Sequence, residues 1–204
     1  MADRIPDIGI LCDDHVPDDD VDALASALAV GGLDIQIRRR RSGPYAGLEW
    51  LAVTSLVVYI FRPYLDAFLG EAGKDHYQLL KSALSSVSKA VMGKGRIIEA
   101  GGVSRSSRFS TELSLIAEDD DGQRFKLLFR NLASPEDIEA AVGAFLTFLE
   151  RYFTEEIDEN MKRECERVRC SGGTVLVTYE PDRQRLVVVD PLPRHIRDRV
   201  DSAR

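Results

Sequence analysis

The chain has 204 residues, of which 44% are hydrophobic and 30% charged, and its formal net charge is -7. This composition excludes a disordered chain, because enough apolar residues are present to form a sizeable core. The acidic balance argues against a general nucleic-acid binder, since neutralising phosphates requires a concentrated positive surface.

Cysteine usage and the first residues indicate the compartment. The chain has three cysteines, Cys12, Cys165 and Cys170, an odd number without the spacing of a disulfide framework. The segment Met1–Arg4 opens with charge and lacks the apolar region of a secretory signal. We therefore expect a cytoplasmic protein of bacterial type with reduced thiols.

The first elements in chain order predict an N-terminal β-α-β unit. The apolar run Ile8–Cys12 is typical of a strand, and the periodic segment Val21–Val30 is typical of a helix that ends at Gly31-Gly32. The alternation over Leu33–Ile37 predicts a second strand. If these strands are parallel neighbours, their crossover should be right-handed.

A strongly apolar segment, Leu48–Leu69, comes next, and Pro63 is expected to kink or end its first half. Within it, Trp50–Phe61 is uncharged, and we interpret it as a buried central helix. Its length is short for a bilayer span, which argues against a membrane protein. A second helix is predicted over about Lys74–Val91, where apolar residues fall at helical spacing.

Two β-hairpins are predicted in the second half of the chain. The segments Glu112–Ala117 and Arg124–Phe129 flank Asp121-Gly122, a dipeptide that tolerates the positive φ of a tight turn. The valine-rich segments Thr174–Tyr179 and Leu186–Asp190 flank a four-residue turn that contains proline. Each pair is expected to be antiparallel.

A long helix is predicted between these hairpins. Ser134 is a suitable N-cap, and Pro135 suits the first helical position. An apolar stripe then follows, made of Ile138, Val142, Phe145, Leu149 and Tyr152. The sequence therefore predicts an α+β protein in which long helices pack on a mixed sheet formed by the β-α-β unit and the hairpins.

Domain organisation follows from length. One domain over residues 1–204 is the expectation, and the alternative is two lobes, residues 1–92 and 93–204. The first lobe would hold the β-α-β unit and helices, and the second would hold the two hairpins with the helix between them.

The strongest candidate for chemistry is Asp13-Asp14, which directly follows the first predicted strand. Paired carboxylates at the end of a strand in an α/β unit suit a hard cation such as Mg²⁺. The stretch Ile8–His15 resembles the first strand of bacterial response-regulator receiver domains, a resemblance that implies Mg²⁺ binding by this acidic pair. The phosphate-accepting aspartate of that family has no counterpart in Leu48–Phe61, so the resemblance implies no phosphotransfer here. The alternative is a solvated acidic loop that caps the following helix.

A second candidate is the segment Lys89–Arg108, where glycines alternate with cations. A glycine-rich backbone with nearby cations can hold an anion. The candidate ligands are Lys94, Arg96, Arg105 and Arg108. The phosphate-loop pattern is not complete, so a flexible connection is the alternative. The arginine run Arg38–Arg41 either docks a partner or ends an edge strand in solvent.

Two functions are consistent with these patterns. The favoured hypothesis is a non-enzymatic protein-interaction or regulatory module, which binds an unknown protein partner or associates with its own copies. The alternative is a Mg²⁺-dependent enzyme that binds a phosphoester or another anion at Asp13 and Asp14.

Overall fold

The computed structural model describes residues 6–29, 33–41, 54–62, 64–65, 73–92, 108–119, 122–168 and 173–190. Their strands are β1 (Ile8–Asp13), β2 (Ile35–Arg40), β3 (Leu56–Ile60), β4 (Phe109–Glu118), β5 (Arg124–Arg130), β6 (Thr174–Glu180) and β7 (Arg185–Val189). The helices are α1 (Asp18–Leu28), α3 (Gly73–Met92), α4 (Pro135–Phe153), α5 (Glu159–Arg167) and the short 3₁₀ helix η1 (Pro181–Arg183).

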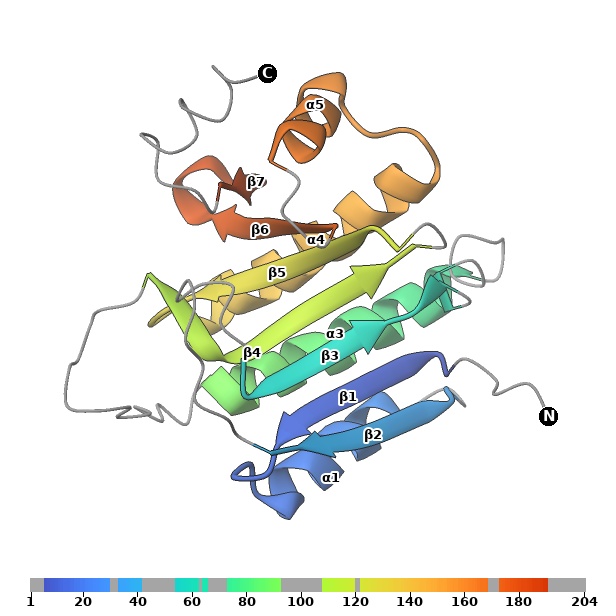
Figure 1. The fold of residues 1–204 in the computed structure, drawn as a ribbon, viewed down its shortest axis with the longest axis vertical. Coiled ribbons are helices and arrows are strands. Elements are labelled where there is room, and N and C mark those ends of the chain that lie inside the picture. The colour runs from blue at the N-terminus through green and yellow to red at the C-terminus, as the bar shows by residue number, and fades with distance from the viewer. Residues whose placement is uncertain are drawn as a thin grey trace.

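The described strands form one seven-stranded sheet in the order β2-β1-β3-β4-β5-β6-β7 (Figure 1). The neighbours β1 and β2, β3 and β4, and β5 and β6 run parallel. The neighbours β1 and β3, β4 and β5, and β6 and β7 run antiparallel. The protein is therefore of the α+β class, with helices packed on a mixed sheet, as the sequence predicted.

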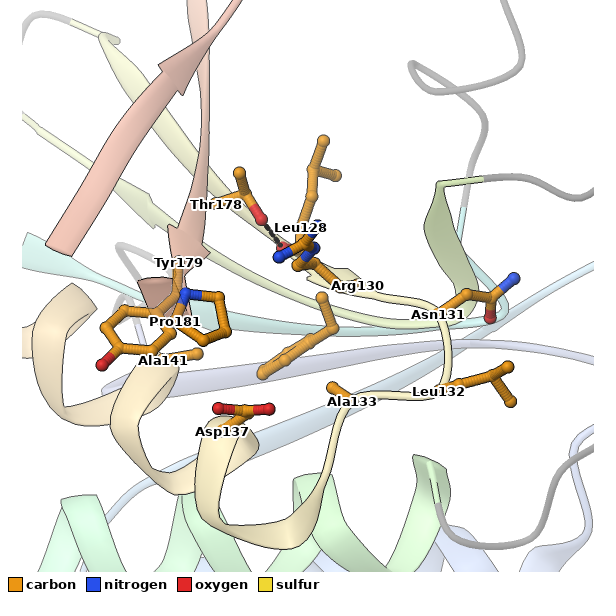
Figure 2. A pocket seen from close by; sticks show the side chains of 11 residues that line it. Leu128, Arg130, Asn131, Leu132, Ala133, Asp137, Ala141, Thr178, Tyr179 and Pro181 are labelled. Carbon is orange, nitrogen blue, oxygen red and sulfur yellow. Dashed lines mark hydrogen bonds between the residues drawn. The ribbon is translucent and has the colours of Figure 1, made fainter. Parts of the chain in front are cut away.

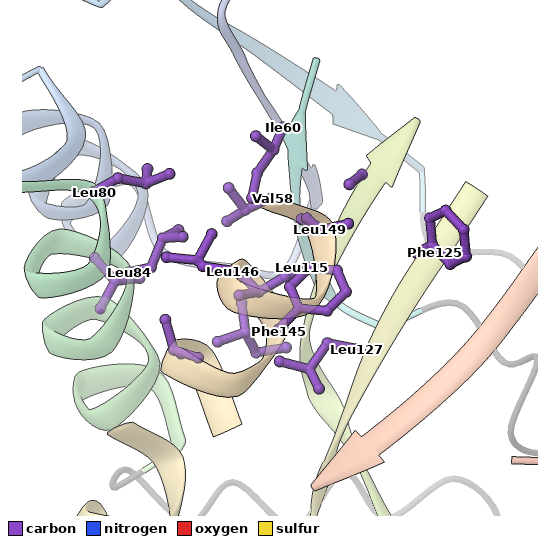
Figure 3. Close-up of a cluster of buried hydrophobic side chains, with 14 of the residues drawn as sticks. Val58, Ile60, Leu80, Leu84, Leu115, Phe125, Leu127, Phe145, Leu146 and Leu149 are labelled. Carbon is purple, nitrogen blue, oxygen red and sulfur yellow. The ribbon is translucent and has the colours of Figure 1, made fainter. Parts of the chain in front are cut away.

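One face of this sheet carries the helices and the main core. Leu80 and Leu84 of α3 and Phe145 of α4 are fully buried against strand residues, and Figure 3 shows them converging with Val58 and Leu115. Burying an aromatic or aliphatic side chain of this size stabilises the fold by about 2 to 3 kcal/mol. Sheet and helices therefore hold each other in place through the apolar stripes of α3 and α4.

The opposite face of the sheet is also buried, although no described helix lies over it. Its central positions carry the buried Val57, Ile116 and Leu176, and the last two are the register partners of Lys126 of β5. Lys126 is 7% exposed. Burial and, to a smaller extent, the nearby charge of Arg40 together lower the pKa of its ammonium group from 10.5 to about 8.

The predicted central helix is wrong where the structure describes this segment. Leu56–Ile60 is strand β3 at the middle of the sheet, and residues 50–53 lie outside the described residues. A strand whose two faces are both buried is apolar throughout, so its pattern cannot be distinguished from that of a buried helix. The β-branched Val57, Val58 and Ile60 were the signal that favoured a strand. Among the described helices, none is long and apolar enough to cross a bilayer.

The connection from β5 to β6 has an unusual hand. Helices α1, α3 and α4 share one face, and β1 and β5 point the same way. From β1 the chain moves to β2 on one side, whereas from β5 it moves to β6 on the other side. The two crossovers therefore have opposite hands, and Figure 1 shows the second as left-handed. Right-handed crossovers make up about 98% of cases.

Candidate functional site

Both groups of residues that could form a functional site in the described chain lie at one edge of the sheet, where strands end. Strands β1, β2, β5 and β6 all end there, at the left in Figure 1, and α1 and α4 begin there. In sheets with parallel strands, ligands commonly bind outside these carboxyl ends. Two separate groups of residues occupy this edge.

The first group, which we call the Asp13 corner, consists of Asp13, Arg40 and Thr54. Asp13 is 3% exposed, and its register partner on β2 is Arg40. The Arg40 Nε donates to Asp13 Oδ1 at 2.5 Å, and Arg40 Nη2 donates to the Thr54 carbonyl at 2.7 Å. The Thr54 hydroxyl lies 2.6 Å from the Ser114 hydroxyl. The Asp13 carboxylate is thus held by a cation of the chain itself.

The other acidic residues of this loop do not converge on Asp13. Asp14 is exposed in the turn after β1, and Asp18 at the start of α1 pairs with Arg39. The described part of the chain contains no group of three or more side chains suited to a metal ion. Mg²⁺ binding by Asp13 and Asp14 stays a prediction, and a metal would have to compete with Arg40.

The predicted anion site lies mostly outside the described residues, which do not include Lys94, Arg96 and Arg105. Arg108, the remaining candidate, lies just before β4. Its guanidinium is 3.5 Å from Glu180 and 5.3 Å from the centre of the Phe109 ring. Arg108 therefore has a carboxylate partner of its own.

The described thiols are shielded from solvent. Cys12 and Cys165 are buried and not in a disulfide. Burial raises the pKa of both thiols, that of Cys165 to about 12. A thiol that keeps its proton is a poor nucleophile and a poor metal ligand.

The second group lies around a pocket of about 200 Å³ at the carboxyl ends of β5 and β6. Its apolar lining includes Leu128, Phe129 and Pro181, and its polar lining includes Arg130, Asp137 and Tyr179. Figure 2 shows Tyr179 and Pro181 on one side and Leu132 on the other. The Thr178 hydroxyl donates to the Leu128 carbonyl at 2.9 Å and fixes the two strands at the pocket.

The turn from β5 into α4 forms the rim of this pocket. The Ala133 N–H donates to the Arg130 carbonyl, which closes a four-residue turn around Asn131 and Leu132. Leu132 has a φ of 58°, in the left-handed region, where glycine or asparagine is preferred. The next residue but one, Ser134, accepts a hydrogen bond from the Asp137 N–H at 3.1 Å, which confirms the predicted N-cap.

The leucine side chain at this position makes no stabilising contact with the described residues. The Leu132 side chain is 100% exposed. Its backbone conformation costs a leucine about 1 to 2 kcal/mol. Glycine or asparagine would form the same turn with less strain.

Three polar side chains of the pocket have no partner within the described residues. Arg130, Asp137 and Tyr179 make no side-chain hydrogen bond or ion pair there. Arg130 and Asp137 are both partly buried and carry opposite charges. We call Arg130, Leu132, Asp137 and Tyr179 the Leu132 patch.

Sequence reasoning did not find the Leu132 patch. The one available signal was a leucine in the short connection between a strand and an N-cap, where small polar residues are typical. Comparison with models of protein families, with curated proteins and with solved structures finds no match for this chain, so its geometry is the basis for a functional proposal.

Proposed function

We propose that this chain is a non-enzymatic protein-interaction module that binds its partner through the Leu132 patch. The observation that carries this proposal is Leu132 itself. It is a large apolar side chain that is fully exposed and held in an unfavourable backbone conformation. Such a residue raises the free energy of the folded chain, and contact with another molecule would offset this cost.

The surroundings of Leu132 support the same function. An apolar anchor beside a pocket, with polar side chains around it, is the arrangement found at energetically important centres of protein interfaces. Arginine and tyrosine are enriched at such centres, and Arg130 and Tyr179 provide them here. Their unpartnered polar groups can accept new partners without first breaking bonds within the described chain.

The metal-dependent enzyme has less support among the described residues. Its main candidate ligand, Asp13, is bound by Arg40, and Asp14 is exposed beside it. We therefore retain the interaction module as the proposal.

Photo-crosslinking in cells that produce the chain tests this function. A photoreactive amino acid replaces Leu132 in one variant and Leu79, an exposed leucine of α3, in a control variant. We expect a covalent product of defined mass from position 132 and none from position 79. Mass spectrometry of the product then identifies the partner. If position 132 yields no specific product, the proposed function is wrong.

A further inference from the structure

The Leu132 patch contains both a projection and a hollow. Leu132 is 100% exposed and points away from Tyr179 and Pro181, so it does not fill the pocket beside it (Figure 2). The pocket has a volume of about 200 Å³. Because a cavity of about 150 Å³ can hold benzene, this pocket has room for a leucine side chain. A projecting leucine and a hollow that fits leucine thus lie on the same small surface.

A surface of this kind can bind the same surface on a second copy of the chain. In a dimer with a two-fold axis, the same patch is used on both chains, so each projection meets the hollow of the other chain. An axis that passes between Leu132 and the pocket would place Leu132 of each copy against the pocket of the other. The contact would bury both leucines, and Leu128, Phe129 and Pro181 of one copy would surround Leu132 of the other.

The charges of the patch are also compatible with a two-fold dimer. Arg130 and Asp137 lie in one pocket and have no ion-pair partner among the described residues. A two-fold axis would bring Arg130 of one copy towards Asp137 of the other, and the reverse pair would form at the same time. A patch that carried only one sign of charge would repel its own copy. The two opposite charges therefore favour self-association over association with a strongly charged partner.

From this geometry we infer that the partner of the Leu132 patch is a second copy of this chain. The two copies form a two-fold dimer in which Leu132 of each copy occupies the pocket of the other, and Arg130 pairs with Asp137 across the interface. This inference rests on the proposed function and specifies its partner.

Sedimentation velocity of the purified chain over a wide range of concentration tests the inference. We expect a monomer at low concentration and a dimer at high concentration. Leu132→Asn removes the apolar anchor and suits the left-handed backbone, so it should raise the dissociation constant of the dimer at least about tenfold. The matched control, Leu79→Asn, changes an exposed leucine on α3 and should leave the dissociation constant unchanged.

Charge reversal tests the geometry of the interface. Arg130→Asp and Asp137→Arg should each weaken the dimer, because each places like charges opposite one another. The double variant, with both reversals, should regain much of the lost affinity. Circular dichroism of every variant checks that the chain still folds, which matters for Asp137→Arg because it places a cation in the first turn of α4.

The outcomes separate this inference from the proposed function. A monomer at every concentration, a dimer that Leu132→Asn leaves intact, or a double variant without recovery would each overturn the self-association. A crosslink from position 132 to a different protein would also overturn it, while the interaction function would stand. A crosslink between two copies of the chain would support both.

Discussion

The Asp13 corner and the Leu132 patch occupy corresponding places in the fold and treat their charges differently. Each lies where a strand ends and a connection leads into a helix and then into a parallel neighbouring strand. At the Asp13 corner the carboxylate is buried and bound by Arg40, which also bonds to the Thr54 carbonyl. At the Leu132 patch the charges of Arg130 and Asp137 have no described partner. The first arrangement stabilises the chain, whereas the second leaves binding capacity for another molecule.

A group of charged residues that stand together in the sequence is therefore a weak guide to a binding site. The acidic residues at and after the end of β1 stand together in the sequence, yet Asp13 and Asp18 are each paired with an arginine of β2. The residues of the Leu132 patch come from β5, from the turn after it, from α4 and from the end of β6, so they form no pattern along the chain.

The largest effect is expected from Arg40→Gln. This change leaves Asp13, which is 3% exposed, without its cation, and unpairing a buried carboxylate costs about 3 kcal/mol of the free energy of unfolding. Urea denaturation measures the loss. The control is Arg38→Gln on the same strand, where an exposed arginine should change the stability by less than about 0.5 kcal/mol. Equal losses in the two variants would show that Asp13 does not depend on Arg40.

The next effect concerns Lys126, whose buried charge is close enough to Arg40 for its pKa to be affected. Its pKa falls from 10.5 to about 8 on folding. Below pH 8 the lysine is charged in both states, so folding carries the cost of burying that charge. Between pH 8 and pH 10.5 the folded state loses the proton while the unfolded state keeps it, so the free energy of unfolding rises with pH.

Lys126→Met removes the titrating ammonium group, so the rise in the free energy of unfolding between pH 8 and pH 10.5 should be absent from the variant. The free energy of unfolding of the unmodified chain should therefore rise relative to that of the variant above pH 8, because the lysine is then neutral in the folded state. Denaturation of both proteins below and above that pH measures it. Taking the difference cancels the opposing titration of Cys165, whose pKa is raised to about 12. A difference that is constant with pH would contradict the lowered pKa.

A smaller, stabilising effect is expected at the Leu132 patch. Leu132→Asn should raise the free energy of unfolding by about 0.5 to 1 kcal/mol, because asparagine tolerates the left-handed backbone and loses no buried contact. Leu79→Asn should instead lower it by about 0.5 kcal/mol, since asparagine is the poorer helix former. Thermal unfolding at a concentration where the chain is monomeric measures both changes. A loss of stability in Leu132→Asn would mean that the leucine supports the fold.

The sequence was sufficient for the fold class and for the elements with strong local signals. The N-cap at Ser134, the stripe of α4 and the valine-rich strands depend on residues close together in the chain. The sequence was misleading for β3, because a strand that is buried on both faces has no polar and apolar alternation. It gave no sign of the left-handed crossover, since strand order depends on contacts between distant segments. The Leu132 patch depends on that strand order, which places β6 beside β5.

The smallest effect on stability is expected from Arg130→Gln, the counterpart of Arg40→Gln in the Leu132 patch. Because Arg130 has no partner within the described residues, the free energy of unfolding of the monomer should change by less than about 0.5 kcal/mol. The same change should weaken the dimer, because it removes the cation that faces Asp137 of the second copy. Denaturation at low concentration and sedimentation at high concentration measure the two effects. If Arg130→Gln destabilised the monomer as much as Arg40→Gln, Arg130 would be a structural residue, and the contrast between the two groups would fail.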